Sequence, residues 1–397
     1  MPTPTLRTCV GALATCLAIQ PVWGADLITF WDRPQSGGNS FNAAPPDQAY
    51  FDALAGTGAR WVRLTFSKWK GQDRDFLIGD ADAYAGLVPE DLALLRQILD
   101  RAERAGLKVV IAPLSLPGRR WSQQNGGSYD DRLWQDMAFQ DQAAEFWADL
   151  AKALKDHPAV AAYNILNVPA PEKASDLAES APLAARRDWQ ATQAGGTRDL
   201  PGFYARITDR IRAQDPVTPI MIDGGWYASP LSLAAWPARL ADDRVLYAFH
   251  MYEPYAATSA PNMKRDQPLR YPGATTEYAG GQLRWDKAAV AAHINTAFDW
   301  ATSQGLPPTR IVAAEFGCMR RWQDCGVYLG DVLDAVEAAG GHWAFYAFRE
   351  DEWEGMDSEL PDTLAPGRFY WLTEEGRADQ LPRDGALMDI LRARMTD

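Results

Sequence analysis

The stretch Arg310-Ile-Val-Ala-Ala-Glu-Phe-Gly-Cys318 carries the main clue to the fold and the chemistry of this chain. Its four apolar residues predict a short buried strand, and Phe316-Gly317 turns the chain away from that strand. A carboxylate at the end of a buried strand is costly unless it is paired or functional. In a barrel of parallel strands, such strand ends form the active face. Glu315 is therefore either a salt-bridged structural residue or a catalytic one.

Seven further runs predict strands, most of them continuously apolar and separated by stretches with helical spacing. The predicted strands are 26–31, 61–66, 108–112, 160–166, 219–223, 245–249, 311–314 and 343–348. This alternation favours an eight-fold α/β barrel, the (β/α)8 or TIM barrel, in a single domain over 26–397. A doubly wound open sheet is the alternative. It is disfavoured because 33–42, the expected loop after the first strand, is not a glycine-rich phosphate loop.

The N-terminus resembles a secretory signal over 1–25. Arg7 is its only charged side chain, and the apolar run that follows is too short to span a bilayer. We therefore expect an exported protein, periplasmic or extracellular, with no membrane contact after the signal is removed. Removal leaves two cysteines, Cys318 and Cys325, which either form a small-loop disulfide or remain free thiols.

Composition excludes several classes of function. The net charge of −13 argues against nucleic acid and anionic membranes as partners. The four histidines show no metal-binding spacing, and neither a Gly-x-Ser-x-Gly elbow nor a cofactor motif is present. We therefore expect no metal and no cofactor. Sixteen tryptophans are a high number; core packing accounts for most of them, and exposed ones often stack on sugar rings.

Polar and aromatic side chains gather at the predicted strand ends. They are Arg63, Asn167, Trp226, His250, Tyr252, Glu315 and, on the last strand, Tyr346. Such a set suits a sugar site, because aromatic rings stack on pyranose faces while Asn and His bind hydroxyl groups. An arginine near Glu315 would keep the carboxylate ionised. Each of these residues also has a purely structural interpretation, as an ion pair or as core packing.

Three motifs in order resemble glycoside hydrolase family 5, the cellulase-like retaining enzymes of the eight-fold barrel clan. They are Tyr163-Asn-Ile-Leu-Asn167, His250-Met-Tyr252 and Ala314-Glu-Phe-Gly317. Trp61-Val-Arg63 resembles the second strand of that family, and the likeness extends over most of 26–360. The resemblance implies a β-linked oligo- or polysaccharide as the partner, with the polar residues above as substrate-binding groups.

The resemblance also implies a retaining mechanism, in which two carboxylates stand ~5–5.5 Å apart. Glu315 matches the nucleophile. The acid/base of the family is a glutamate between the Asn and Pro after strand four, and this chain has Asn167-Val168-Pro169 there. Valine cannot transfer a proton. Ala112 and Leu114 also stand where the family often carries Asp and His.

Three hypotheses follow from Val168. In the first, the chain is an active β-glycosidase with impaired or altered activity, and another carboxylate replaces the missing acid. Glu172 is the first choice, before Glu253, Glu350 and Asp351. In the second, the barrel is a pseudoenzyme that binds carbohydrate without hydrolysing it. In the third, the valine replaces a glutamate through engineering or a sequence change. General acid–base help is typically worth ~10²–10⁴ in rate.

Overall fold

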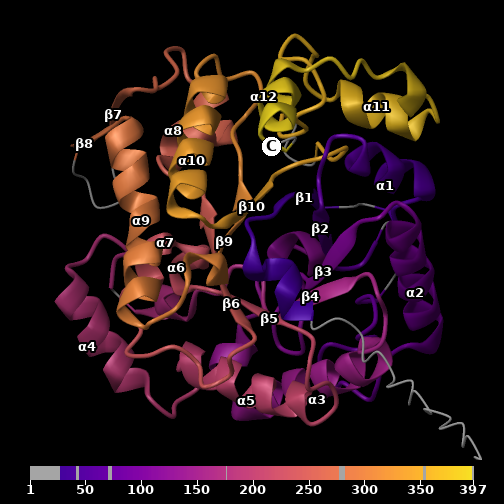
Figure 1. Cartoon of the computed structure of the whole chain (residues 1–397), viewed down its shortest axis with the longest axis vertical. Coiled ribbons are helices and arrows are strands. Elements are labelled where there is room, and N and C mark those ends of the chain that lie inside the picture. Colours follow the sequence, from indigo (N-terminus) through magenta and orange to yellow (C-terminus); the bar gives the residue numbers. More distant parts are fainter. Residues whose placement is uncertain are drawn as a thin grey trace, which may run out of the picture.

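Eight parallel strands close into a barrel in the order β1-β10-β9-β6-β5-β4-β3-β2 (Figure 1). The computed structural model describes residues 27–41, 44–69, 74–175, 177–276, 282–351 and 355–395, so the expected signal over 1–25 lies outside the described residues. The prediction of a single-domain (β/α)8 barrel is confirmed. No helix within the described ranges has the length and apolar character needed to cross a membrane.

The elements alternate along the chain as the apolar runs predicted. The barrel strands are β1 (Ser36–Phe41), β2 (Trp61–Phe66), β3 (Lys108–Pro113), β4 (Val160–Asn164), β5 (Ile220–Asp223), β6 (Val245–Met251), β9 (Ile311–Phe316) and β10 (His342–Phe345). The helices are α1 (Gln48–Ala55), α2 (Pro89–Arg104), α3 (Met137–Leu154), α4 (Leu183–Gln193), α5 (Leu200–Arg212), α6 (Gly225–Ala228), α7 (Pro230–Leu233), α8 (Tyr255–Thr258), α9 (Lys287–Ser303), α10 (Cys325–Ala339), α11 (Arg368–Glu374) and α12 (Ala386–Met395). An antiparallel pair, β7 (Gly273–Thr276) and β8 (Gln282–Trp285), lies outside the barrel.

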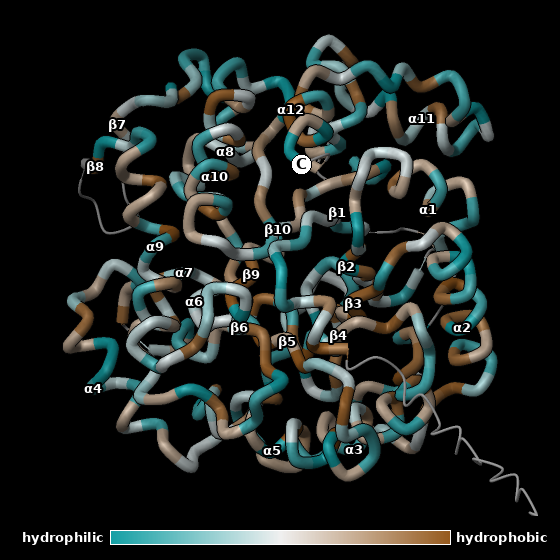
Figure 2. Tube along the Cα trace, viewed as in Figure 1, coloured by the Kyte–Doolittle hydropathy of each residue, from teal (hydrophilic) through white to brown (hydrophobic). Residues whose placement is uncertain are grey.

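The strands are buried on both faces, which explains their continuous apolar sequence. All six residues of β2 are buried, and so are the seven residues of β6. Figure 2 shows hydrophobic residues along the central strands and more hydrophilic residues on outer helices such as α4. The polar residues in these strands therefore lie in the core or at the C-terminal ends of the strands, where they need hydrogen-bond partners.

The first strand differs from the prediction. Leu27–Asp32 is a 3₁₀ turn, and the strand is Ser36–Phe41, in the segment predicted to be a loop. The turn closes the N-terminal end of the barrel: Trp31 is fully buried against Trp61, and its indole N–H donates to the carbonyl of Ala161 at 3.0 Å. An apolar run that plugs a barrel has the same composition as a strand inside it, so the sequence signal is ambiguous.

The sequence of β1, Ser-Gly-Gly-Asn-Ser-Phe, has low strand propensity. Its hydrogen bonds come from two parallel neighbours, β2 and β10, which fix its conformation regardless of propensity. Gly37 is required here, because a Cβ at this position would lie 2.5 Å from the carbonyl oxygen of Trp61. Tertiary packing thus selects small residues where an isolated strand would favour branched ones.

Cys318 and Cys325 form a disulfide with a Cα–Cα distance of 5.7 Å. It connects the chain just beyond β9 to the first residue of α10. Of the two alternatives for this cysteine pair, the structure shows the small-loop disulfide. The three long connections after β4, β6 and β10 contain α4, the β7–β8 pair and α11, respectively.

We expect Trp31→Ala to lower the free energy of unfolding by about 3–5 kcal/mol, because it leaves a cavity under the barrel and removes the hydrogen bond to Ala161. Chemical denaturation monitored by circular dichroism measures this change. Trp371→Ala is the matched control, since Trp371 is 66% exposed. An equal loss of stability in both variants would contradict the role of Trp31 as a plug.

Candidate active site

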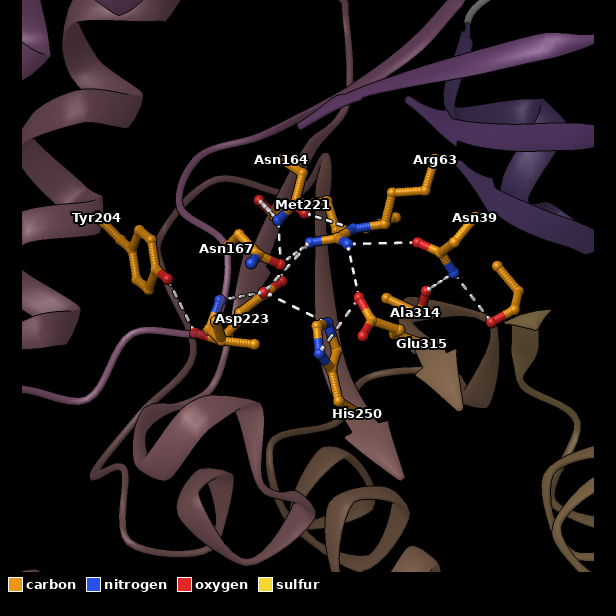
Figure 3. Close-up of polar contacts among 12 residues, drawn as sticks. Asn39, Arg63, Asn164, Asn167, Tyr204, Met221, Asp223, His250, Ala314 and Glu315 are labelled. Atoms are coloured by element: carbon orange, nitrogen blue, oxygen red, sulfur yellow. Dashed lines mark hydrogen bonds and ion pairs between the residues drawn. The ribbon is translucent and has the colours of Figure 1, made fainter. Parts of the chain in front are cut away.

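The guanidinium of Arg63 lies at the centre of the site, fully buried in the middle of β2 (Figure 3). Arginine presents five N–H donors, and a buried charge is tolerated only when those donors are paired. Three asparagines accept from it: Asn164 from Nε at 2.8 Å, Asn39 from Nη1 at 3.3 Å and Asn167 from Nη2 at 2.6 Å. Two carboxylates, Glu315 and Asp223, complete the shell.

Glu315 stands at the C-terminal end of β9, as the sequence predicted. Its Oε2 accepts from Arg63 Nη1 at 3.2 Å, and its Oε1 accepts from the Tyr252 hydroxyl at 2.6 Å. Burial raises its pKa above the ordinary value of 4.5, while Arg63 and Tyr252 act in the opposite direction. The side chain keeps 18% of its surface exposed, so the carboxylate is both oriented and open to a ligand.

Asp223 is a second carboxylate in this network, at the end of β5. It lies 3.6 Å from Arg63 Nη2, and it accepts from Asn164 Nδ2 at 2.9 Å and from the backbone N–H of Val168 at 3.0 Å. The side chain is fully buried, and this burial raises its pKa. Asp223 therefore holds Arg63 and the connection after β4 in place through these contacts, and it does not face solvent.

His250 lies between the two carboxylates. Its Nδ1 is 3.7 Å from Glu315 Oε2, and its Nε2 is 3.5 Å from Asp223 Oδ2. The β6–β9 register places it directly beside Glu315. Burial, and then the charge of Arg63, hold the pKa of His250 well below 6.5, so the imidazole is neutral at neutral pH. A neutral ring here adds no second positive charge beside Arg63.

Val168 occupies a strained backbone position beside this network. Its φ of 43° lies in the left-handed region, where a β-branched residue is a genuine outlier. Its N–H is held by Asp223. The side chain of Asn167, the preceding residue, accepts from Arg63. The side chain of Asn167 and the backbone N–H of Val168 are therefore both bound to the Arg63 network. The backbone conformation at position 168 is thus imposed by its partners and not favoured by valine itself.

Glu172, the first choice as a substitute acid, points elsewhere. It is only 2% exposed, and its Oε2 accepts from the backbone N–H of Trp226 at 3.0 Å. Its Oε1 packs against Gly225, where an added Cβ would lie only 2.0 Å from that oxygen. Burial raises the pKa of Glu172 to about 7. The pKa would suit a general acid, but the carboxyl group is enclosed between the β4 and β5 connections.

The segment that Glu172 holds is unusual. Trp226, Tyr227 and Ala228 follow one another in the left-handed region, with φ of 44°, 59° and 65°. The N–H of Tyr227 donates to the carbonyl of Pro169 at 3.0 Å, next to Val168. Non-glycine residues persist in such conformations only when their surroundings determine them. Glu172 and Pro169 together provide that constraint.

The remaining predicted residues divide into two groups. Tyr346 follows β10 and lies near Tyr252. The pKa of Tyr252 is raised mainly by burial, then by Glu315 and, to a smaller extent, by Tyr346. Trp226 instead packs its ring on Trp189, and its indole N–H donates to Leu177 at 3.4 Å, so it contacts the β4–α4 connection.

The other suggested acids are also engaged in the structure. Glu350 and Asp351 are both buried, and Asp351 pairs with Arg320. Glu253 is half-buried, and it accepts from the backbone N–H of Tyr255 at 2.9 Å.

Within the described ranges, one group of side chains is close enough to hold a metal ion: Asp100, Glu103 and His157. It lies at the end of α2 and just before β4, at the opposite end of the barrel from Glu315. Asp100 and Glu103 are exposed, as acidic side chains commonly are without an ion. The group therefore has no connection to the site around Arg63.

The barrel holds a buried Arg–Glu–Tyr arrangement at its strand ends, which suits the glycoside hydrolase class. The family model of cellulase, glycosyl hydrolase family 5, matches residues 28–352. The chain therefore belongs to this family, and the resemblance found in its sequence motifs is confirmed.

Individual relatives are distant. A β-xylosidase from Phanerodontia chrysosporium is 26% identical over 218 residues, which are 54% of this chain and 38% of that protein. Thermotoga maritima Cel5A in complex with cellobiose matches with a TM-score of 0.61 and 15% identity, covering 92% of this chain and 100% of that one. The Pseudomonas stutzeri endoglucanase Cel5A matches at 0.58 and 18%, covering 91% and 94%. These structural likenesses show the fold.

The sequence identified Arg63, Asn167, His250, Tyr252 and Glu315, and the structure brings all five into one network. It missed the buried partners of Arg63 on β1, β4 and β5: Asn39, Asn164 and Asp223. Asp223 carried the same signal as Glu315, a carboxylate closing an apolar strand. Asn39 gave no comparable signal, because it lay in the segment predicted to be a loop. Asn164 stood in a predicted strand and in the Tyr163–Asn167 motif, but it was given no role.

We expect Glu172→Gln to flatten the pH dependence of stability. Because the folded pKa of Glu172 is about 7 and its ordinary value is 4.5, the folded state binds more protons between these values, and stability falls as pH rises through them. Relative to wild type, the variant should gain on the order of 2–3 kcal/mol above neutral pH. Urea unfolding at several pH values measures this difference.

The exposed Glu145→Gln serves as the control and should follow the wild-type curve. If Glu172→Gln also follows it, the carboxyl group is not buried in solution as it is in this structure.

Proposed function

We propose that this chain is a retaining β-glycosidase in which Glu315 attacks the anomeric carbon without help from an acid at position 168. The observation that carries the proposal is the contrast between the two halves of the site. Glu315 keeps its partners Arg63 and Tyr252, while valine stands at the acid/base position of the family. The proposed substrates are β-linked glycans, and the proposed location is outside the cytoplasm.

The contacts of Glu315 suit a nucleophile. A nucleophilic carboxylate must be ionised, and the Arg63 charge together with the Tyr252 hydroxyl stabilises the ionised form against the cost of burial. The two partners bind one oxygen each, which fixes the plane of the carboxylate. Its partly exposed edge then faces the space where a sugar ring would bind.

The leaving-group side lacks a matching proton donor among the acids considered. Glu172, Glu350 and Asp351 are buried, and Glu253 accepts from the start of α8. A sugar alkoxide therefore departs slowly, at a cost of ~10²–10⁴ in rate. Leaving groups that are stable as anions avoid this cost. We expect activated glycosides to react much faster than natural glycosidic linkages.

The second candidate function is carbohydrate binding without turnover. The same observation favours it, since in a site without an acid a bound glycan dissociates before it is cleaved. The solved relatives bind sugars of this kind: Thermotoga maritima Cel5A was crystallised with cellobiose and with mannotriose. Turnover of activated substrates separates the two functions.

The direct test uses dinitrophenyl β-glycosides of glucose, mannose, xylose and cellobiose, whose leaving groups need no proton. We expect a burst of dinitrophenolate and a mass increase of one glycosyl unit on the intact protein. Glu315→Gln should abolish both, while the protein stays folded by circular dichroism. Absence of burst and adduct with all four sugars would favour the binding-only function.

Val168→Glu tests the empty acid position. We expect it to raise kcat/KM on unactivated oligosaccharides by ~10²-fold or more, and to change the rate of dinitrophenyl release little. Val168→Gln is the matched control, because glutamine has the same length as glutamate and no acidic proton to transfer. Equal gains in both variants would show that relief of the left-handed valine, and not acid catalysis, caused the effect.

The pH profile provides a further check. With dinitrophenyl glycosides, kcat/KM should rise through a single acidic limb above pH 4.5, because burial raises the pKa of the Glu315 carboxyl and only its ionised form attacks. Val168→Glu should add a descending alkaline limb on oligosaccharides. An alkaline limb in the wild type on oligosaccharides would mean that another carboxyl group supplies the proton.

A further inference from the structure

Beside the acid position lies a group of rings and cations that the proposed mechanism does not use. We call it the aromatic–cation cluster: Arg119, Trp121, Tyr129, Lys173 and Tyr227. The Arg119 guanidinium lies 4.9 Å from the centroid of Trp121 and 4.6 Å from that of Tyr129. The Lys173 ammonium is 4.3 Å from the Tyr129 ring, and Tyr227 is 6.3 Å from Trp121.

Arg119 is the buried part of this cluster. It is 1% exposed, and none of its three guanidinium nitrogens has a hydrogen-bond partner among the described residues. Among the described residues, Arg119 forms an ion pair with Asp131, and the distance from Nη1 to Oδ1 is long at 3.7 Å. A buried guanidinium whose donors are unpaired leaves a positive field in the rings that cover it. The cluster is therefore polarised to receive negative charge.

The cluster adjoins position 168. The backbone of Tyr227 is bonded to Pro169, the residue that follows Val168. The left-handed turn holds the Tyr227 side chain out, 42% exposed, beside the half-buried Trp121. Trp121 and Tyr227 thus form an open aromatic surface beside the connection that carries Val168. Backbone strain of this kind is often kept at functional sites.

The charge of the cluster is opposite to that of the whole protein. Arg119 and Lys173 contribute two positive charges, against one from Asp131, in a chain whose net charge is −13. Lys173 is exposed, so its ammonium is available to a ligand. The pKa of the Glu172 carboxyl, next to Lys173 in the chain, is raised to about 7 by burial, which limits the negative charge there.

We propose that the aromatic–cation cluster binds an aromatic leaving group that departs as an anion, so that the preferred substrates are β-glycosides of phenols. This inference rests on the proposed function of Glu315. Rings suit stacking on Trp121 and Tyr227, and an anionic oxygen suits the field of Arg119 and Lys173. A simple sugar alkoxide gains less from this surface and still requires a proton.

The step balances without a protein acid. A Glu315 oxygen forms a bond to the anomeric carbon as the bond to the phenolic oxygen breaks, and the electron pair leaves on that oxygen as phenolate. Water then attacks the same carbon, its proton passes to solvent, and Glu315 leaves as a carboxylate. The phenolate takes up a proton from solvent. The sum is aryl glycoside plus water giving sugar plus phenol.

The binding test uses three small probes on the full chain: benzoate, benzamide and cyclohexanecarboxylate. The first is an aromatic anion, the second an uncharged aromatic and the third a non-aromatic anion. By isothermal titration calorimetry, benzoate should bind roughly fivefold or more tightly than the other two, because only it uses both ring and charge. Equal affinity for all three would overturn the inference.

Variants locate the binding. Tyr227→Ala and Lys173→Met should each weaken benzoate roughly fivefold. Trp371→Ala and Lys155→Met are the controls, one exposed aromatic and one exposed cation elsewhere, and should leave it unchanged. Loss in the controls, or no loss in the cluster variants, would overturn the site.

Kinetics then separate the inference from the proposed function. In a series of aryl β-glycosides, Tyr227→Ala and Lys173→Met should lower kcat/KM roughly fivefold, while the matching alkyl glycosides change little. A burst from Glu315 that is unaffected by both variants would overturn the leaving-group site and keep the glycosidase. Benzoate binding without any sugar adduct would overturn the leaving-group role together with the glycosidase.

Discussion

The buried charge of Arg63 is the constraint on which the rest of the site depends. A guanidinium inside a barrel is stable only if acceptors surround it, and here five acceptors come from four strands or their ends, β1, β4, β5 and β9. Meeting this requirement fixes where Glu315 and Asp223 must lie. The orientation of the proposed nucleophile is thus a consequence of neutralising one cation in the core. Replacing either carboxylate by a group that cannot accept a hydrogen bond would leave a donor of Arg63 unpaired in the core.

The two halves of the site are built on different parts of the barrel. Glu315, Tyr252 and His250 stand on β6 and β9 or directly after them. The proposed leaving-group side is built from the connections after β3, β4 and β5, which include Val168 and the left-handed turn at Tyr227. Loops tolerate substitution better than strands. A substitution in these connections can therefore leave the geometry around Glu315 unchanged.

The strained backbone near Val168 is held by contacts from other residues. Asp223 and Arg63 hold the two residues at the end of β4, and the N–H of Tyr227 is held by Pro169. None of these contacts uses the side chain at position 168. The frame that would present an acid therefore persists with a valine in it. The carboxyl group of Glu172 is part of this frame, which explains why it is buried.

The sequence by itself determined the barrel and the family, because apolar runs mark the strands and three ordered motifs at the strand ends match the family. It also named the residues that gather around Glu315, because polar residues at strand ends must converge on one face. It did not determine the first strand, since a plug such as Leu27–Asp32 and a buried strand have the same apolar composition. Only the tertiary structure decided that Asp223 shares Arg63 with Glu315 and that Glu172 is enclosed. These facts depend on distances between chain segments far apart in sequence, and burial at such junctions has no local signature.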